Sequence, residues 1–461
     1  MEQFAYYPAP TELDFPPETL YLTSPRVVAT CHEEVLRTAL CAMPRLDTII
    51  ILDSKNFGVP WVIFATMLST PQLRVFEIRG RIHRAFDRLA KPPYQSFAPL
   101  RAFRYVPDHI DTPVRIGPTE KRMLVILLEK VSATLETLVL PSESVPLRLM
   151  NLWEWPNLRE LRLRGDSRPI HRCRTPLVSV FGRMPRLHTL SLLLAHSKKS
   201  PLGPLWPAHS ECKSLPWAEL KSLTLSWIHP DDLIFAHLPP TLRHLSFRAW
   251  PRLFIMYYDA HRLWAERVHW KLKAPKSAQI SRILPLCPSA NLERIELEYV
   301  ADSAELELLR RIPDIAPRLE WLQIIRYRSA WDLSPVSVVR EQISTHTIPI
   351  ADSQQEGLVE PLSFLPRLRT FRFCPDYEHI TLMFVWKDPN GDEDPCDPDE
   401  VAGIIARNAG PELLEVDVSE ATKGVAAWYT YEIKRSTDGS RRARCTGFSM
   451  DQDREWYVEQ P

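Results

Sequence analysis

The sequence predicts an α/β fold, an irregular leucine-rich repeat solenoid with parallel strands inside and helices outside. Three observations predict it. A hexamer, in which a leucine is followed by apolar residues three and five positions later, recurs along most of the chain. Many copies are preceded by Pro-x, and most follow a stretch with helical periodicity. A repeated order of helix, turn and short strand is the signature of leucine-rich repeats.

The hexamers predict the strands. Their first leucines are Leu46, Leu73, Leu100, Leu135, Leu158, Leu187, Leu220, Leu242, Leu292, Leu319, Leu368 and Leu413. In a strand, alternate side chains point to opposite faces. The first, fourth and sixth residues of each hexamer are therefore expected to point toward the core. The spacing between copies is irregular, which indicates insertions between repeats.

The Pro-x prefix separates these hexamers from chance matches. It stands at Pro44, Pro71, Pro156, Pro185, Pro240, Pro317, Pro366 and Pro411. Proline is 43 of 461 residues, which predicts about one such prefix among twelve copies, whereas eight have it. Helices are expected over residues 33–40, 61–68, 121–131, 177–183, 304–312 and 400–408. Because proline cannot continue a helix, it is expected to end each helix and lead into the strand.

The repeats divide the chain into three predicted parts. Residues 1–30 are a proline-rich lead-in, residues 31–420 are the solenoid, and residues 421–461 form a C-terminal cap resembling a β-hairpin. The hairpin is predicted from two strand-like stretches, 428–433 and 442–448, separated by a turn at 437–439. A cap would cover the apolar end of the last repeat. The alternative is a hairpin that binds a partner.

Composition limits the classes of function. Lys+Arg and Asp+Glu number 57 each, so the net charge argues against nonspecific binding to nucleic acid or to a membrane surface. No apolar run is long enough to span a membrane, and the N-terminus does not read as a secretory signal. The 8 cysteines form no Cys-x-x-Cys pair, so reduced thiols are expected. These features predict an intracellular protein, in cytoplasm or nucleus. A monomer is also expected.

No motif for catalysis, a cofactor or a metal is recognisable, so a non-enzyme is expected. Glycine is only 13 of 461 residues, and no glycine-rich phosphate loop occurs. The acidic run 388–394 partly matches a calcium-binding loop, but Glu393 stands where that loop needs glycine. A simpler interpretation is that Asp397 caps the helix that follows, with Pro398 as its first residue.

Side chains that alternate with the core positions are candidates for a partner-binding concave face. They are the second, fourth and sixth residues after each first leucine. The candidates are Arg79, Arg104, Arg162, Arg164, Glu296, Glu298 and Trp321. Such a face would be basic toward the N-terminus and more acidic past the middle, a gradient that could orient a protein target. The alternative is that these side chains are simply solvated.

The stretch Asn291-Leu292-Glu293-Arg294-Ile295-Glu296-Leu297-Glu298-Tyr299 and its continuation through 317–324 resemble the repeats of fungal F-box proteins, especially those of mushroom-forming basidiomycetes. The resemblance implies a ribonuclease-inhibitor-like horseshoe that recognises substrates for a cullin-type ubiquitin ligase. It also implies a Skp1-type adaptor as partner. The F-box that would bind the adaptor is not recognisable, since only residues 15–20 match its opening. A stand-alone leucine-rich repeat interaction or regulatory protein is the alternative.

Overall fold

The computed structural model describes residues 19–22, 32–52, 58–80, 97–106, 117–197, 202–250, 270–271, 274–287, 290–327, 359–374, 398–422, 425–437 and 439–450. The chain divides into two compact units. Unit 1 contains residues 1–108 and 117–137, and unit 2 contains residues 109–116 and 138–461. Each unit combines helices with parallel strands, which confirms the predicted α/β class. Two of the insertions indicated by the spacing, an aromatic-rich one after Trp250 and one that contains the polar stretch 342–357, lie wholly or mostly outside the described residues, as does the acidic run 388–394.

Unit 1 is a small parallel sheet whose strands are joined or followed by helices. The strands are β1 (Thr19–Leu22), β2 (Thr48–Ile51), β3 (Val75–Arg79) and β4 (Ala102–Val106), paired in that order. The helices are α2 (Glu33–Cys41), α3 (Trp61–Leu68) and α4 (Pro118–Val131). Strand β1 lies inside the predicted lead-in and extends the sheet beyond the first hexamer.

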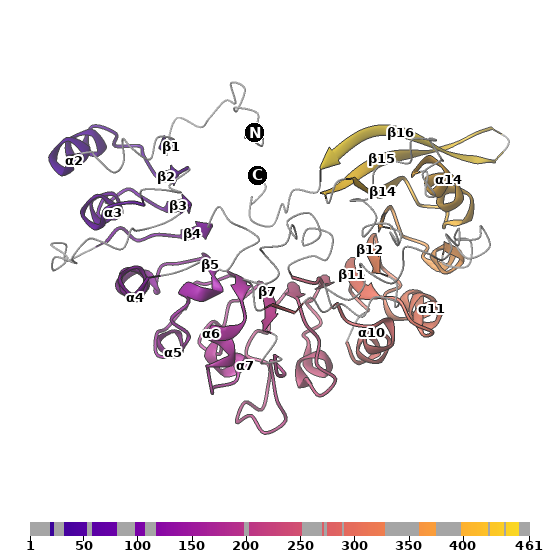
Figure 1. Cartoon of the computed structure of the whole chain (residues 1–461), viewed down its shortest axis with the longest axis horizontal. Coiled ribbons are helices and arrows are strands. Elements are labelled where there is room, and N and C mark those ends of the chain that lie inside the picture. Colours follow the sequence, from indigo (N-terminus) through magenta and orange to yellow (C-terminus); the bar gives the residue numbers. More distant parts are fainter. Residues whose placement is uncertain are drawn as a thin grey trace, which may run out of the picture. The chain divides into compact units, whose positions relative to one another are not determined.

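Unit 2 repeats the same order over a longer sheet. Its elements are β5 (Thr137–Pro141, beginning at the last residue of unit 1), η1 (Ser142–Ser144), α5 (Leu147–Met150), β6 (Glu160–Asp166), α6 (Arg168–His171), α7 (Leu177–Val180), β7 (Thr189–Ser197), β8 (Ser222–Leu225), η2 (Leu233–His237), β9 (His244–Phe247), β10 (Trp270–Lys271), α10 (Ser277–Ile283), η3 (Leu284–Leu286), β11 (Arg294–Val300), α11 (Glu305–Ile315), β12 (Trp321–Tyr327), η4 (Glu360–Phe364), β13 (Thr370–Cys374), α14 (Pro398–Asn408), β14 (Glu415–Thr422), β15 (Val425–Arg435) and β16 (Arg441–Met450). The sheet order is β5-β6-β7-β8-β9-β11-β12-β13-β14-β15-β16, and β10 pairs with β7. Figure 1 shows α10, α11 and α14 on one side of the strands that they connect.

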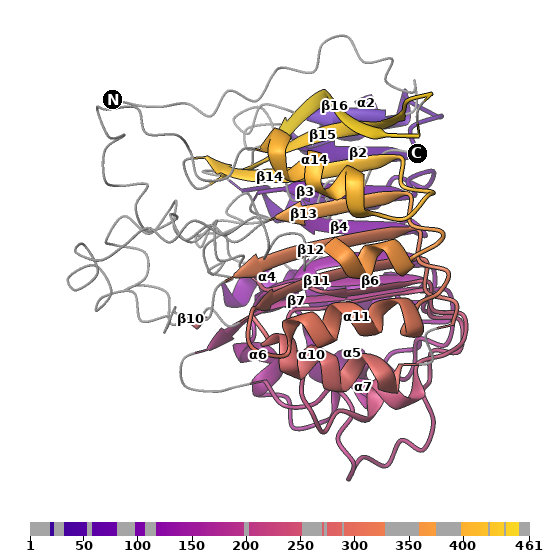
Figure 2. The same ribbon diagram turned by 90° about the vertical axis from the view of Figure 1, so that its right-hand side faces the viewer.

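Every hexamer forms a strand, and each strand begins two residues after its first leucine. A repeated backbone rung joins the copies. For example, the carbonyl of Arg159 accepts from the N–H groups of His188 and Thr189 at 2.7 and 2.9 Å. The carbonyl of His188 accepts in the same way from the next copy, at Lys221 and Ser222. The hydrogen-bond register therefore follows from the leucine positions, and Figure 2 shows β11, β12, β13 and β14 of unit 2 side by side.

The prolines of the Pro-x prefix occupy turns between helix and strand. In all eight copies the N–H of the first leucine donates to the carbonyl of the residue before the proline, as from Leu319 to Ala316 at 3.1 Å. Proline thus takes the second position of a four-residue turn, where its fixed φ is favourable. A helix or a 3-10 helix precedes each of these turns; it ends two or three residues before the proline in six copies, whereas α5 and α7 end earlier. The expected order of helix, proline and strand is confirmed.

The leucines bury the space between strands and helices. Leu161, Leu163, Ile295 and Leu297 are each at most 1% exposed, and the same positions of the other strands are buried as well. The helix predicted over 177–183 is shorter, since α7 ends at Val180 and a turn from Ser179 to Gly182 follows. The described part of the chain contains no helix long and apolar enough to cross a membrane.

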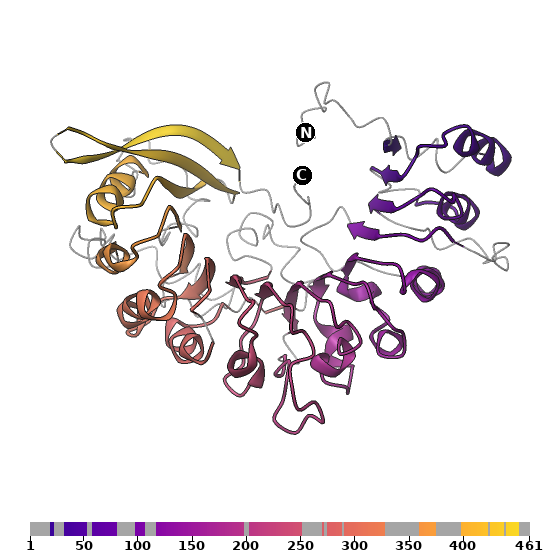
Figure 3. The same ribbon diagram turned by 180° about the vertical axis from the view of Figure 1, so that it is seen from behind.

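The end of unit 2 changes from parallel to antiparallel pairing. Strand β15 pairs antiparallel with β14, and β16 pairs antiparallel with β15. Figure 3 shows this ribbon as the last part of the sheet. The two predicted strands of the hairpin are therefore confirmed. The turn between them uses Gly439 at φ +82°, a left-handed conformation that glycine adopts without strain.

Candidate binding face

The side of the unit 2 sheet that faces away from the helices carries mainly polar and charged side chains, and we call it the polar face. Its members alternate with the buried leucines along each strand. The strand registers align them in rows across the sheet. The first row consists of Glu160, Thr189, Ser222, His244, Arg294, Trp321, Thr370 and Glu415. The second consists of Arg162, Ser191, Thr224, Ser246, Glu296, Gln323, Arg372 and Asp417.

The first row is the accessible part of the polar face. All of its members are half-buried or exposed. In the second row, by contrast, all members except Arg162 and Arg372 are buried. Glu298, which comes two residues after the second row on β11, is only 1% exposed. A partner that touches this face would therefore meet the starts of the strands first.

The centre of the first row is a stacked cation and aromatic pair. The guanidinium carbon of Arg294 lies 3.7 Å from the ring centroid of Trp321, its register partner on β12. Arg294 Nη2 also donates to Glu296 Oε1 at 2.8 Å, and Ser246 Oγ donates to Glu296 Oε2 at 2.6 Å. Arg294 is held by a buried carboxylate on one side and by an indole on the other. Both contacts fix the position of the two side chains without fully covering them.

His244 completes this cluster on β9. Its Nδ1 lies 3.0 Å from Ser222 Oγ, and its Nε2 lies 3.9 Å from Glu296 Oε2. Burial lowers the pKa of His244 to about 4, and Arg294 adds to this effect, whereas Glu296 opposes it. Burial alone would raise the pKa of Glu296, but Arg248, His244 and Arg294 hold that pKa below its ordinary value. At neutral pH the cluster therefore consists of a neutral imidazole beside a carboxylate and guanidinium groups.

A serine, a histidine and a carboxylate lie next to one another here, as in a hydrolytic triad: Ser222, His244 and Glu296. Their geometry, however, is not that of a triad. Glu296 is engaged by Arg294 and Ser246, and its contact with His244 is too long for a hydrogen bond. An oxyanion also needs free donors near the nucleophile. Strand β9 pairs with β8 on one side and with β11 on the other. The backbone N–H groups between these strands are therefore used in sheet hydrogen bonds and do not point at an oxyanion. This arrangement supports a rigid polar surface rather than acyl transfer.

A second stack lies toward the end of the polar face. Arg372 on β13 lies 4.1 Å from the ring centroid of Trp428 on β15, and its Nε is 2.9 Å from Asp417 Oδ2. Burial raises the pKa of Glu415, Asp417 adds to that effect, and Arg372 opposes it. Trp428 is 1% exposed. This stack is more deeply buried than that of Arg294 and Trp321, so it offers less surface to a partner.

The structure places the seven predicted face residues in three groups. In unit 1, Arg79 and Arg104 both contact Glu77, at 2.6 and 3.5 Å. On β6, Arg162 is 2.5 Å from Glu160, whereas Arg164 is 5% exposed and stacks 3.4 Å above Trp250.

The third group lies on β11 and β12. Here Arg294 joins Glu296 to Trp321, and Glu298 accepts from Tyr327 Oη at 2.7 Å. Most of the predicted charges are thus compensated within the sheet.

Several residues of the polar face are absent from that prediction. His244, Arg372 and Asp417 stand two or four positions after a first leucine, so the same counting rule identifies them. Trp250 and Trp428 lie outside the hexamers, and no spacing in the sequence brings them beside Arg164 and Arg372.

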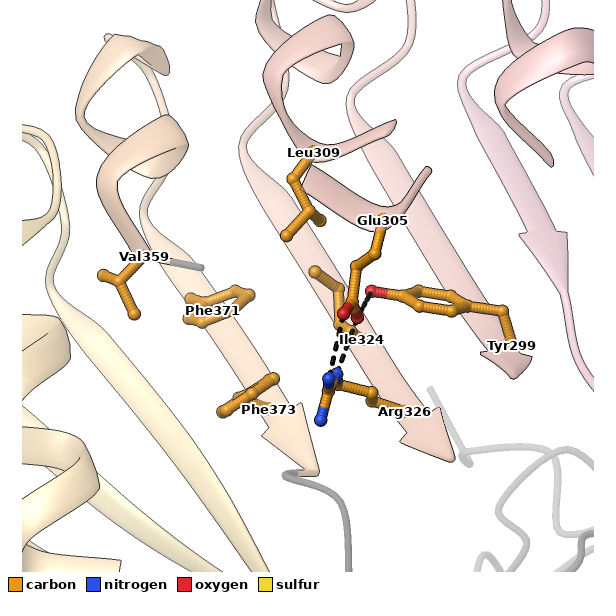
Figure 4. Close-up of a pocket in the computed structure, with 8 residues that line it drawn as sticks. All are labelled: Tyr299, Glu305, Leu309, Ile324, Arg326, Val359, Phe371 and Phe373. Carbon is orange, nitrogen blue, oxygen red and sulfur yellow. Dashed lines mark hydrogen bonds and ion pairs between the residues drawn. The ribbon is translucent and has the colours of Figure 1, made fainter. Parts of the chain in front are cut away.

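A buried cluster on the helix side of the sheet binds α11 to its neighbouring strands. Glu305 accepts from Arg326 Nε at 2.6 Å, from Arg326 Nη2 at 2.9 Å and from Tyr299 Oη at 3.0 Å. Figure 4 shows these groups beside Phe371 and Phe373. The cavity of about 10 Å³ has room for no more than one water. Burial and Glu305 raise the pKa of Tyr299 well above its ordinary value, so the phenol remains protonated. The cluster is better explained as a contact that holds α11 against its neighbouring strands than as a ligand site.

Within the residues that the structure describes, no three His, Cys, Asp or Glu side chains come together as metal ligands would. The chain matches no known family model, and no curated protein matches it.

Proposed function

We propose that this protein is a leucine-rich repeat scaffold, a horseshoe-type solenoid that binds another protein through its polar face. The repeated unit of helix, proline turn and strand supports the repeat assignment. The half-exposed Arg294–Trp321 stack carries the binding proposal, because tryptophan and arginine are the residues most often found at the energetic centre of interfaces. The accessible first row around the stack supplies polar groups for a rim.

The target is a protein surface with groups that suit this centre. An aromatic or apolar side chain would pack on Trp321, and a carboxylate would meet the outward edge of Arg294, whose side chain is 45% exposed. Since β11 and β12 pair over seven residues each, the stack is held by a rigid support and little entropy is lost on binding.

The proposal includes a role in which the scaffold holds a target for a cullin-type ubiquitin ligase, as the resemblance to fungal F-box repeats implies. The contribution of this chain would be positioning and not chemistry. Purification of the full-length protein from its own cells tests this part. A co-purifying Skp1-type adaptor supports the ligase role, and a bound target without the adaptor supports a stand-alone repeat protein.

Binding through the polar face is tested with matched variants in the same purification. Trp321→Ala and Arg294→Glu are expected to release the bound target by removing the stack. Arg310→Glu on α11, an exposed arginine of the helix side, is the control and is expected to retain it. Retention of the target by both face variants, or its loss in the control alone, would refute the polar face as the binding surface.

A further inference from the structure

Strand β16 has an edge that no other strand occupies in the described part of the chain. Every pairing of β16 is made to β15, from Ala427↔Met450 to Arg435↔Arg441. Residues Cys445, Thr446, Gly447 and Phe448 are exposed, and the Phe448 side chain is 58% exposed. An exposed strand edge presents backbone N–H and C=O groups to which another strand can pair.

A capping role accounts for only part of β16, which lies against α14. Strand β15 already covers the edge of β14, and it buries Trp428, Tyr431 and Ile433 at 8% exposure or less. Strand β16 extends the ribbon by ten residues but buries little apolar surface of its own. Ordering a strand costs conformational entropy that burial normally offsets. An additional contact on its far side would supply that compensation.

The charges of β16 indicate which partner would fit. Arg442 lies directly opposite Lys434, and like charges at facing positions are unfavourable. Arg444 lies opposite Glu432, but Glu432 contacts Lys434 at 3.3 Å. Among the described residues, neither Arg442 nor Arg444 has an ion pair or a hydrogen bond to its side chain, and both are exposed.

Neighbouring Arg441 differs, since its side chain donates to the carbonyls of Ala409 and Gly410 at 2.8 Å. It is therefore engaged in holding the end of α14. Arg442 and Arg444 stand two positions apart, so they project from the same side of β16 at a spacing of about 7 Å. A second copy paired along this edge would bring the same cations together, which disfavours self-association.

We propose that the open edge of β16 binds an extended acidic segment of a partner protein as an added strand. The main chain of that segment would pair with β16, and carboxylates at alternate positions would face Arg442 and Arg444. The recognised pattern consists of two acidic residues separated by one residue, which is preferably β-branched. This inference depends on β16 alone and does not rest on the polar face.

Fluorescence anisotropy with the full-length protein tests the proposal. The probe is a labelled ten-residue peptide of alternating glutamate and valine, matched in length to β16. One control peptide has lysine in place of each glutamate, and another has proline at a central valine, which cannot donate to a ladder. The glutamate peptide is expected to bind and both controls to fail. Binding should weaken in about 1 M salt, where the Debye length falls to about 3 Å.

The protein variants decide which groups act. Arg442→Glu with Arg444→Glu is expected to weaken binding at least about tenfold. The milder pair Arg442→Ala and Arg444→Ala is expected to weaken it less, and it serves if the charge reversal does not fold. Arg407→Glu, an exposed arginine on α14, is the matched control for charge, and Trp321→Ala separates this site from the polar face. Both should bind as the wild type does.

Three results would overturn the proposal. The first is unchanged affinity in both double variants, and the second is equal binding of the proline peptide, which would mean charge attraction without strand pairing. The third is a wild-type dimer in sedimentation that the double variants dissociate, since that outcome would assign the edge to a second copy.

Discussion

The arginines of β11 and of β16 lie in the same sheet but in opposite environments. Arg294 on β11 contacts a buried carboxylate and an indole, so its position is fixed by the fold. Arg442 on β16 is exposed and faces a lysine. The difference shows that a charged side chain on a strand is held by the fold where an opposite charge and an aromatic ring lie beside it. On the last strand, Arg442 and Arg444 have no such contact among the described residues and remain available to another molecule, whereas Arg441 is engaged by the end of α14.

The largest effect is expected where a charge is placed among the leucines. Leu161→Asp should lower the free energy of unfolding by about 4 kcal/mol, because it buries a carboxylate without a partner at a position that is 0% exposed. Urea unfolding of the full-length protein measures it. The adjacent Arg162→Asp, on the polar face, should cost less, because its carboxylate stays near water although the ion pair with Glu160 is lost. Equal losses in the two variants would contradict the alternation of the two faces.

The second-largest loss of stability is expected when one member of a buried ion pair is removed. Glu305→Leu is expected to cost about 3–5 kcal/mol, since Arg326 and Tyr299 lose their shared carboxylate. The double variant Glu305→Leu with Arg326→Met leaves no charge behind and should be more stable than Glu305→Leu alone. A double variant less stable than Glu305→Leu alone would contradict the idea that the loss comes from leaving the Arg326 charge without its carboxylate.

A pH effect of intermediate size is expected at His244. Its pKa is lowered to about 4 in the folded protein and is about 6.5 in an unfolded chain, so the unfolded state binds the proton first. Stability should therefore fall as the pH decreases from about 6.5 to about 4, by at most about 3 kcal/mol. Below about 4.5 the lowered pKa of Glu296 acts in the same direction.

His244→Asn should flatten this pH dependence in unfolding curves recorded at several pH values, and the exposed His209→Asn is its control. A wild-type protein that is equally stable at pH 7 and pH 4.5 would show that the pKa of His244 is not lowered in the folded state, so that His244 is protonated there at pH 4.5.

The smallest effect on stability is expected at β16. Arg442→Glu should change the free energy of unfolding by less than about 0.5 kcal/mol, with a slight gain because the unfavourable pairing with Lys434 becomes favourable. Arg294→Glu on β11 should cost more, because it brings a second carboxylate beside buried Glu296. Thermal melts of the two variants compare them. A larger loss at Arg442 than at Arg294 would reverse the contrast between the strands.

The residues of the polar face can largely be predicted by counting positions along each hexamer. The contacts that their charged side chains make can be predicted only in part. Alternation along a strand is local, so Arg162, Glu296 and Trp321 are assigned to one face from the hexamers alone. Some of the partners that neutralise them are close in sequence, as Glu160 is for Arg162 and Arg294 is for Glu296, whereas other contacts come from outside the hexamers. Arg164 is a clear case, since Trp250 lies far from it in sequence and covers it in the fold. An arginine expected to face a partner is thereby buried.

The amino-acid sequence by itself determined the strand starts, the proline turns and the hairpin, because each depends on backbone preferences and side-chain alternation within a few residues. Strand β1 and the shortness of α7 escaped it, since β1 has no hexamer and α7 is ended by a turn at glycine. Tertiary structure decided which charges are buried or exposed and which of them stack on aromatic rings. Those outcomes depend on distances between strands that are far apart in the chain, and electrostatic energy depends on distance and burial rather than on sequence order.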